Sequence, residues 1–167
     1  MDSVIARLRD VWKSMIEGKG AHCPVCDKWG KVYPIVMTGT CVRSLIWLRN
    51  EHIRTGEGWV HVPTTAPRHV MRSYSISSLK HWGMVQQRAE VPEPKVEGQP
   101  KTKYSGYWRL TPVGQDFLDG LCQMPKKVFI YNDTRWGVSD EMVYARDCLD
   151  KQFDYDALMR ETFAGNM

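Results

Sequence analysis

The chain of 167 residues lacks any apolar run near the roughly 20 residues that a helix needs to cross a bilayer. Its first residues, MDSVIARLRDVWKS, alternate charged and apolar side chains and so lack the apolar block of a signal peptide. The five cysteines are an odd number, which is a poor match for a disulfide framework. We therefore expect a protein of the cytoplasm, with reduced thiols and no membrane partner.

The sequence also lacks the motifs of several enzyme classes. It has no glycine-rich phosphate loop, no H-E-x-x-H motif and no G-x-S-x-G motif. Nothing in the linear order of its cysteines and histidines distinguishes a nucleophile from a buried thiol. With 43% apolar and 25% charged residues, the chain has the composition of a folded domain. The sequence predicts a protein that is not an enzyme.

The net charge of +4 is unevenly distributed along the chain. Residues 31–127 carry 14 Lys and Arg against 7 Asp and Glu, whereas residues 128–167 carry 4 against 8. A polyanion would be attracted to the middle segment and repelled by the end. Chance alone also produces such a split, so the charge pattern favours a nucleic-acid partner only in combination with a suitable fold.

The N-terminal segment has the spacing of an amphipathic helix. Its apolar residues Val4, Leu8, Val11 and Met15 recur at steps of four, three and four. A helix with such a wide apolar face must bury it, either against its own domain or against a second copy. We expect packing against the core first and a homodimer contact second.

Two cysteines follow this segment. Cys23 and Cys26 are separated by two residues, so both sulfurs can face one ion, and thiolates suit Zn²⁺. A closed structural site takes four ligands, but there is no second C-x-x-C. Two alternatives stay open, a zinc site and a reduced thiol pair in a β-turn. The nearby candidates for the remaining ligands are His22, Cys41, His52 and His61.

From residue 38 the pattern changes to a sequence of short elements. A second amphipathic helix begins at Thr38 or Thr40, and Gly56 and Gly58 close it. The next elements are predicted as an extended piece at 59–63, short helices at about 66–71 and 74–82, a strand at 84–88, a charged loop at 89–103 and a strand at 106–111. This order is typical of a winged helix-turn-helix.

A family resemblance covers about residues 38–121. Residues 79–85 (LKHWGMV) and 107–118 (YWRLTPVGQDFL) resemble winged-helix regulators of the MarR, PadR and ArsR kind. In those families a glycine before an apolar pair closes the recognition helix, and the wing ends as L-T-x-x-G-x-x-x-L. The C-P-x-C element and the F-D-Y-D-x-L-M end are also similar to small uncharacterised bacteriophage proteins. The resemblance implies a DNA-binding fold.

We therefore predict an α+β protein in three parts. Residues 1–37 form the N-terminal helix and the CxxC and strand element, and residues 38–124 form the winged-helix domain. Residues 125–167 form a β-hairpin, turning at Asn132 and Asp133, followed by two short acidic helices at 140–149 and 153–163. We expect this last part to pack onto the core.

In a winged helix the second short helix enters the major groove of DNA. If Ile76 and Leu79 point inward, the helical period directs Tyr74, Ser77, Ser78 and His81 outward, toward base edges. A solvated helix face without a ligand is the alternative. Flanking cations would contact phosphates. The candidates for that role are Arg68, Arg72, Lys101, Lys103 and Arg109.

Two functions follow from this interpretation. The first is a phage-encoded regulator that binds double-stranded DNA with modest sequence discrimination, because serine and histidine contacts discriminate less than a bidentate Arg or Asn does. The second is an adaptor or inhibitor of a host protein complex, with the winged helix as a scaffold. Its contact surface would be the apolar N-terminal helix and the acidic C-terminal helices.

Overall fold

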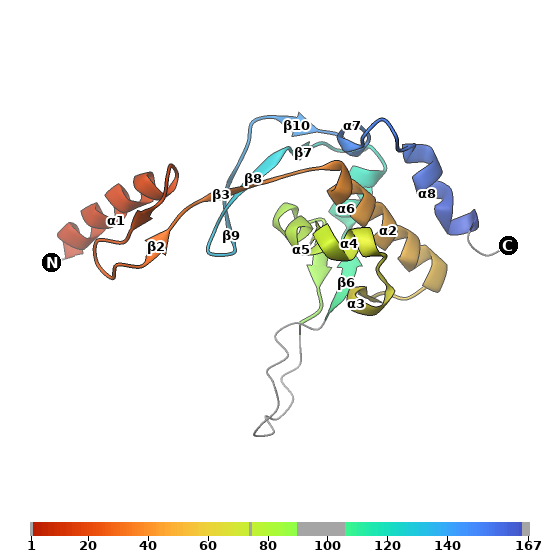
Figure 1. The fold of residues 1–167 in the computed structure, drawn as a ribbon, viewed down its shortest axis with the longest axis horizontal. Coiled ribbons are helices and arrows are strands. Elements are labelled where there is room, and N and C mark those ends of the chain that lie inside the picture. Colours follow the sequence, from red (N-terminus) through yellow and green to blue (C-terminus); the bar gives the residue numbers. More distant parts are fainter. Residues whose placement is uncertain (1, 74, 90–105, 165–167) are drawn as a thin grey trace, which may run out of the picture. The chain divides into compact units, whose positions relative to one another are not determined.

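The computed structural model describes residues 2–73, 75–89 and 106–164. The chain divides into two compact units. Unit 1 consists of Met1–Val36 and Pro125–Glu141, and unit 2 of Met37–Met124 and Met142–Met167. Both units combine helices with short antiparallel strands, so the protein belongs to the α+β class (Figure 1). The segment 125–167, predicted from the sequence as one part, contributes to both units.

Unit 1 contains a helix, a small hairpin and a three-stranded sheet. The helix is α1 (Asp2–Ile16), and the hairpin pairs β1 (Ala21–His22) with β2 (Trp29–Gly30). The sheet has the order β3 (Tyr33–Val36), β8 (Lys127–Tyr131), β9 (Thr134–Val138). Because proline cannot donate a ladder hydrogen bond, Pro34 lies in an edge strand, as predicted. The predicted turn between β8 and β9 is confirmed, with positive φ angles at Asn132 and Asp133.

Helix α1 buries only the C-terminal end of its apolar face. Ile16 is fully buried, and Trp12 donates from Nε1 to the carbonyl of Ala21 at 3.2 Å. Val4 and Val11 are each 58% exposed. The expected burial of the whole stripe against the chain's own core is therefore not found in the described residues.

Helix α2 (Gly39–Thr55) is the centre of unit 2. It begins where Thr38 Oγ1 accepts a hydrogen bond from the amide of Cys41, and it ends at Gly56, which has a left-handed φ of 70°. Both predicted ends are confirmed. Its fully buried side chains include Val42 and Leu45. Helices α4 (Arg68–Ser73), α5 (Ser75–Leu79), α6 (Pro112–Leu118) and α8 (Tyr155–Ala164) all pack against it.

Unit 2 contains a three-stranded sheet. It is antiparallel, with the order β4 (Val60–His61), β6 (Tyr107–Leu110), β5 (Val85–Gln87). Between β4 and β5 the chain forms α3 (Val62–Thr65), α4, α5 and the 3-10 helix η1 (Lys80–Trp82). The predicted extended piece at 59–63 is thus too long, because Pro63 occupies the first turn of α3, where proline is favoured.

The C-terminal part of unit 2 is less helical than predicted. Residues 142–143 form β10 (Met142–Val143), which pairs with β7 (Met124–Pro125), so the predicted helix at 140–149 shortens to α7 (Ala145–Cys148). Helix α8 is hydrogen-bonded to α2, because Asn50 Nδ2 of α2 donates to the backbone carbonyl of Leu158 in α8 at 2.9 Å. None of the helices in the described ranges is both long and apolar enough to cross a membrane.

The close contact of α6 with the chain beside β5 gives a prediction about stability. A Cβ added at Gly114 would meet the carbonyl oxygen of Met84 and would lie 2.7 Å from Leu110 Cδ1. We expect Gly114→Ala to lower the free energy of unfolding by about 1–3 kcal/mol, because overpacking forces backbone to move. Urea denaturation measures this change.

Gly58→Ala is the matched control for this substitution. A Cβ there meets nothing within 4 Å, and Gly58 has no left-handed φ. Its free energy of unfolding should change by less than about 1 kcal/mol. Equal destabilisation by the two substitutions would contradict the packing described for α6.

Candidate nucleic-acid interface

Helix α5 is buried on one side only. Ile76 and Leu79 point inward, as the helical period predicts, and are 4% and 0% exposed. Ser77 is exposed, whereas Ser78 and His81 are half-buried, and all three take part in contacts within the protein. Tyr74, Lys101 and Lys103, also predicted to bind DNA, lie outside the described residues. The described part of α5 and η1 therefore presents a narrow polar face.

Helix α4 places two cations beside α5. Arg68 and Arg72 are exposed and four residues apart, so they share one face of α4. Neither forms an ion pair within the described parts of the chain. Between them, burial and then the charge of Arg43 lower the pKa of His69. The lowered pKa favours the neutral ring, so the positive charge of α4 comes from the two arginines.

Arg109, the third predicted cation within the described residues, lies on the sheet of unit 2. Its Nε donates to Oε1 of Gln86 at 2.8 Å, and its guanidinium lies 4.7 Å from the ring centre of Trp59. The next pair along the strands repeats this arrangement, with the guanidinium of Arg88 5.1 Å from the ring centre of Tyr107. The sequence predicts a core position for Trp59, as for the other tryptophans, whereas the structure leaves Trp59 half-buried beside Arg109.

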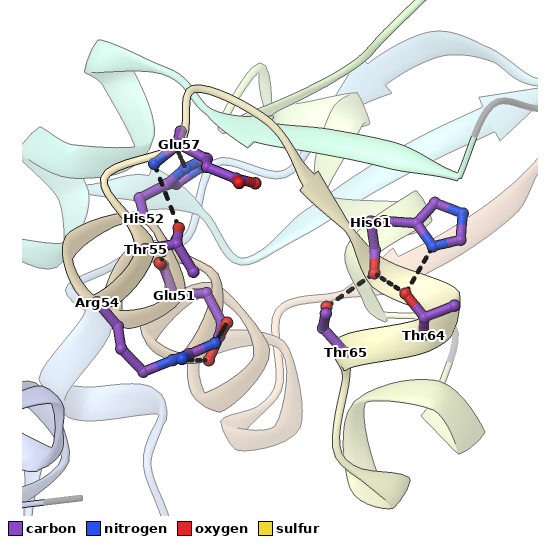
Figure 2. A network of polar contacts seen from close by, with 8 residues as sticks. All are labelled: Glu51, His52, Arg54, Thr55, Glu57, His61, Thr64 and Thr65. Carbon is purple, nitrogen blue, oxygen red and sulfur yellow. Dashed lines mark hydrogen bonds and ion pairs between the residues drawn. The ribbon is translucent and has the colours of Figure 1, made fainter. Parts of the chain in front are cut away.

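His52, near the C-terminal end of α2, forms a hydrogen bond with β6, the strand that carries Arg109. His52 Nδ1 contacts the carbonyl of Glu57 at 2.9 Å, and Nε2 contacts the amide of Leu110 at 3.1 Å (Figure 2 shows the contact to Glu57). Since a carbonyl only accepts and an amide N–H only donates, the ring is neutral and carries its hydrogen on Nδ1. His52, a candidate zinc ligand, therefore uses both ring nitrogens within the fold.

Figure 2 also shows polar contacts near the C-terminal end of α2 and at the end of β4. Arg54 donates to both carboxylate oxygens of Glu51, at 3.0 and 2.7 Å, so its charge is neutralised. The Nδ1 atom of His61 lies 2.7 Å from Oγ1 of Thr64, and Thr65 Oγ1 donates to the carbonyl of His61. These contacts hold the ring of His61 at the end of β4.

The thiol pair lies in a tight turn of unit 1. The amide of Asp27 donates to the carbonyl of Cys23 at 2.8 Å, and Nδ1 of His22 lies 2.8 Å from the carbonyl of Asp27. Backbone N–H groups of Val25 and Cys26 donate to the Cys23 sulfur, and this lowers the pKa of its thiol. The turn therefore favours a thiolate, the form that binds a metal.

A complete metal centre is not found at this turn. Across the described ranges, no group of three or more His, Cys, Asp and Glu residues could hold a metal ion. The candidates Cys41 and His61 belong to unit 2, where each contacts a threonine, Thr38 and Thr64 respectively. Zinc binding at Cys23 and Cys26 stays a prediction, with two of the usual four ligands identified.

Comparison of the chain with protein-family models, curated proteins and solved structures gave no match. The functional interpretation consequently depends on the chain's own residues.

Of the predicted DNA-binding residues, the structure places Arg68, Arg72 and Ser77 on adjoining helices of unit 2 with exposed side chains.

The turn at Cys23 gives a prediction about pH dependence. Burial and the charge of Asp116 raise the pKa of Cys122, whereas backbone donors lower that of Cys23. Alkylation by iodoacetamide requires the thiolate. The rate of alkylation at Cys23 should therefore rise at a lower pH than the rate at Cys122. Peptide mass spectrometry across a pH series measures both rates in one sample, and coincident pH profiles would contradict the described hydrogen bonds.

Proposed function

We propose that unit 2 contains a winged helix-turn-helix that binds double-stranded DNA, with α5 and η1 in the major groove. The succession α2, β4, α3, α4, α5, η1, β5, β6 and the sheet order β4-β6-β5 support this proposal. Lys101 and Lys103 lie between β5 and β6 in the sequence, where the wing of such a fold would be. The resemblance at residues 79–85 and 107–118 agrees with it.

One observation carries the proposal. Helix α5 packs its apolar side toward α2, and its exposed Ser77 lies beside α4, whose exposed Arg68 and Arg72 form no ion pair with the residues that the structure describes. Arg68 and Arg72 would neutralise backbone phosphates beside the groove, and such contacts supply most of the affinity of proteins of this kind. Ser77, Ser78 and His81 would contact base edges, and these side chains discriminate weakly between bases.

This function needs no catalysis. The protein would act as a regulator in the cytoplasm of a bacterial host, encoded by a bacteriophage, in line with the resemblance of its C-P-x-C element. A zinc ion at Cys23 and Cys26 would serve to stabilise the turn of unit 1 and would take no part in contacting DNA. Measurement of the zinc content of the purified protein tests that part of the proposal.

Salt dependence of binding tests the proposal directly. The affinity for a fluorescent duplex of about two helical turns should fall steeply as salt rises, because phosphate contacts release counterions. Arg72→Ala should weaken binding to all sequences alike and reduce the salt slope by about one. Arg135→Ala, an exposed arginine on β9 of unit 1, is the matched control and should leave the slope unchanged.

The preference of the protein among DNA sequences tests whether α5 and η1 contact bases. His81→Ala should change the ranking among duplexes of different sequence, whereas Arg72→Ala should not. Absence of duplex binding at low salt, or an affinity that salt does not weaken, would overturn the proposal.

A second function is favoured by the exposed apolar face of α1. Val4, Val11 and Met15 are each more than half exposed, and such stripes are typical of surfaces that bind another protein. In that case the chain would be an adaptor or inhibitor of a host protein complex. A pull-down from nuclease-treated host lysate distinguishes the two functions, since loss of every partner after nuclease would exclude the second.

A further inference from the structure

The turn between β1 and β2 holds two sulfurs in contact with each other. The amide of Cys23 donates to the carbonyl of Lys28 at 2.9 Å, and Asp27 adopts a left-handed φ of 57°, so the chain reverses tightly between them. The thiol of Cys26 donates to the sulfur of Cys23, and so do the backbone amides of Val25 and Cys26. Hydrogen bonds to a ligating atom orient it toward a metal. The turn is therefore arranged to place both sulfurs on one ion.

The turn supplies only half of the ligands that zinc needs. Closed structural sites of zinc take four ligands. In the sequence of unit 1, His22 is the only histidine or cysteine besides this pair, and its Nδ1 already lies 2.8 Å from the carbonyl of Asp27. Within the described ranges, no three His, Cys, Asp or Glu residues are grouped so that they could hold a metal ion. The missing two ligands must therefore come from outside this turn.

The turn is open to a partner. Each residue from Pro24 to Trp29 is exposed, Cys26 among them. Two of these exposed residues have large apolar side chains, Val25 at 62% and Trp29 at 50%. Apolar side chains that gather on an exposed surface are typical of contacts with another protein. The half-site and these apolar side chains thus lie on one accessible hairpin.

A second copy of the chain matches what this hairpin lacks. Two copies related by a two-fold axis present the same patch to each other. Each copy then supplies two sulfurs, and the four sulfurs together make the all-cysteine site that is common for structural zinc. The apolar side chains of Val25 and Trp29 would be covered in the same contact. No ligand of a third kind is needed.

The charge of the hairpin also suits such a site. Zn²⁺ and four thiolates together carry two excess negative charges. From Ala21 to Lys31 the sequence has two lysines, Lys28 and Lys31, against one carboxylate, Asp27. Each copy therefore brings one excess positive charge, and two copies offset the charge of the metal centre.

We propose that one zinc ion joins two copies of this chain, each of which supplies Cys23 and Cys26. Four Zn–S bonds form, and the protons of the four thiols pass to solvent. The proposal rests on the zinc site proposed above for the same turn, and it adds the second copy as the partner that completes the site. It does not depend on DNA binding.

The mass of the full chain in solution, with and without zinc, tests the proposal. The protein is depleted of metal with a chelator, kept reduced with a phosphine so that no disulfide forms, and titrated with zinc sulfate. Light scattering after size-exclusion chromatography should give the 19.3 kDa of one chain without zinc and twice that mass with it. Bound zinc should saturate at one ion for every two chains, and the chelator should restore the single chain.

Two cysteine variants assign the ligands. Cys26→Ser removes one sulfur at an exposed position and should abolish both the zinc uptake and the doubling of the mass. Cys122→Ser is the matched control, because it removes a half-buried thiol of unit 2 and should leave both results unchanged. Circular dichroism melting verifies that each variant is folded.

His22→Asn tests the nearest alternative ligand and should also leave the mass and the zinc content unchanged. A single chain that binds one zinc ion, and loses it in His22→Asn or Cys122→Ser, would overturn the shared site while keeping a zinc site at the turn. Absence of zinc binding, or a mass that zinc does not change, would likewise overturn the shared site. All of these measurements are made without DNA, so failure of the duplex function leaves them intact.

Discussion

The burial of helix α2 is the constraint on which unit 2 depends. Three of its apolar side chains, Val42, Leu45 and Leu48, have no exposed surface. Helices α4, α5, α6 and α8 and strand β6 all pack against this one helix. Since α5 is only five residues long, it could not be stable alone, and its orientation follows from how Ile76 and Leu79 fit against their neighbours.

The same constraint fixes the sheet. The amide of Leu110 donates to His52 near the end of α2, and Trp108 is buried on the inner face of β6. Alternation along β6 then forces Tyr107 and Arg109 to the outer face. The position of α5 and the direction of the side chains of β6 are thus consequences of one packing arrangement around α2.

Local features of the sequence predicted much of this structure. Thr38 and Gly56 mark the ends of α2 because a hydroxyl can cap a helix and glycine tolerates a left-handed φ. The pair Asn132 and Asp133 marks a hairpin turn for the same conformational reason. The inward direction of Ile76 and Leu79 follows from helical periodicity alone. In each case the cause lies within a few residues of the effect.

Features that depend on distant residues could not be predicted. The pairing of β3 with β8 joins residues 91 to 97 positions apart, so nothing near Tyr33 indicates its partner Ile130. Likewise, the ring contacts of Trp59 with Arg109 depend on the register of two strands separated by about 50 residues of sequence. The pairing of β10 with β7 overrides the local preference for helix at residues 140–144.

The central claim is that duplex DNA contacts α4 and α5 of unit 2. Chemical-shift mapping of backbone amides by NMR, during titration with a short duplex, tests it most directly. The account predicts that the largest shifts occur between residues 68 and 82. Shifts confined to unit 1 or to helix α8, with residues 68–82 unchanged, would contradict it.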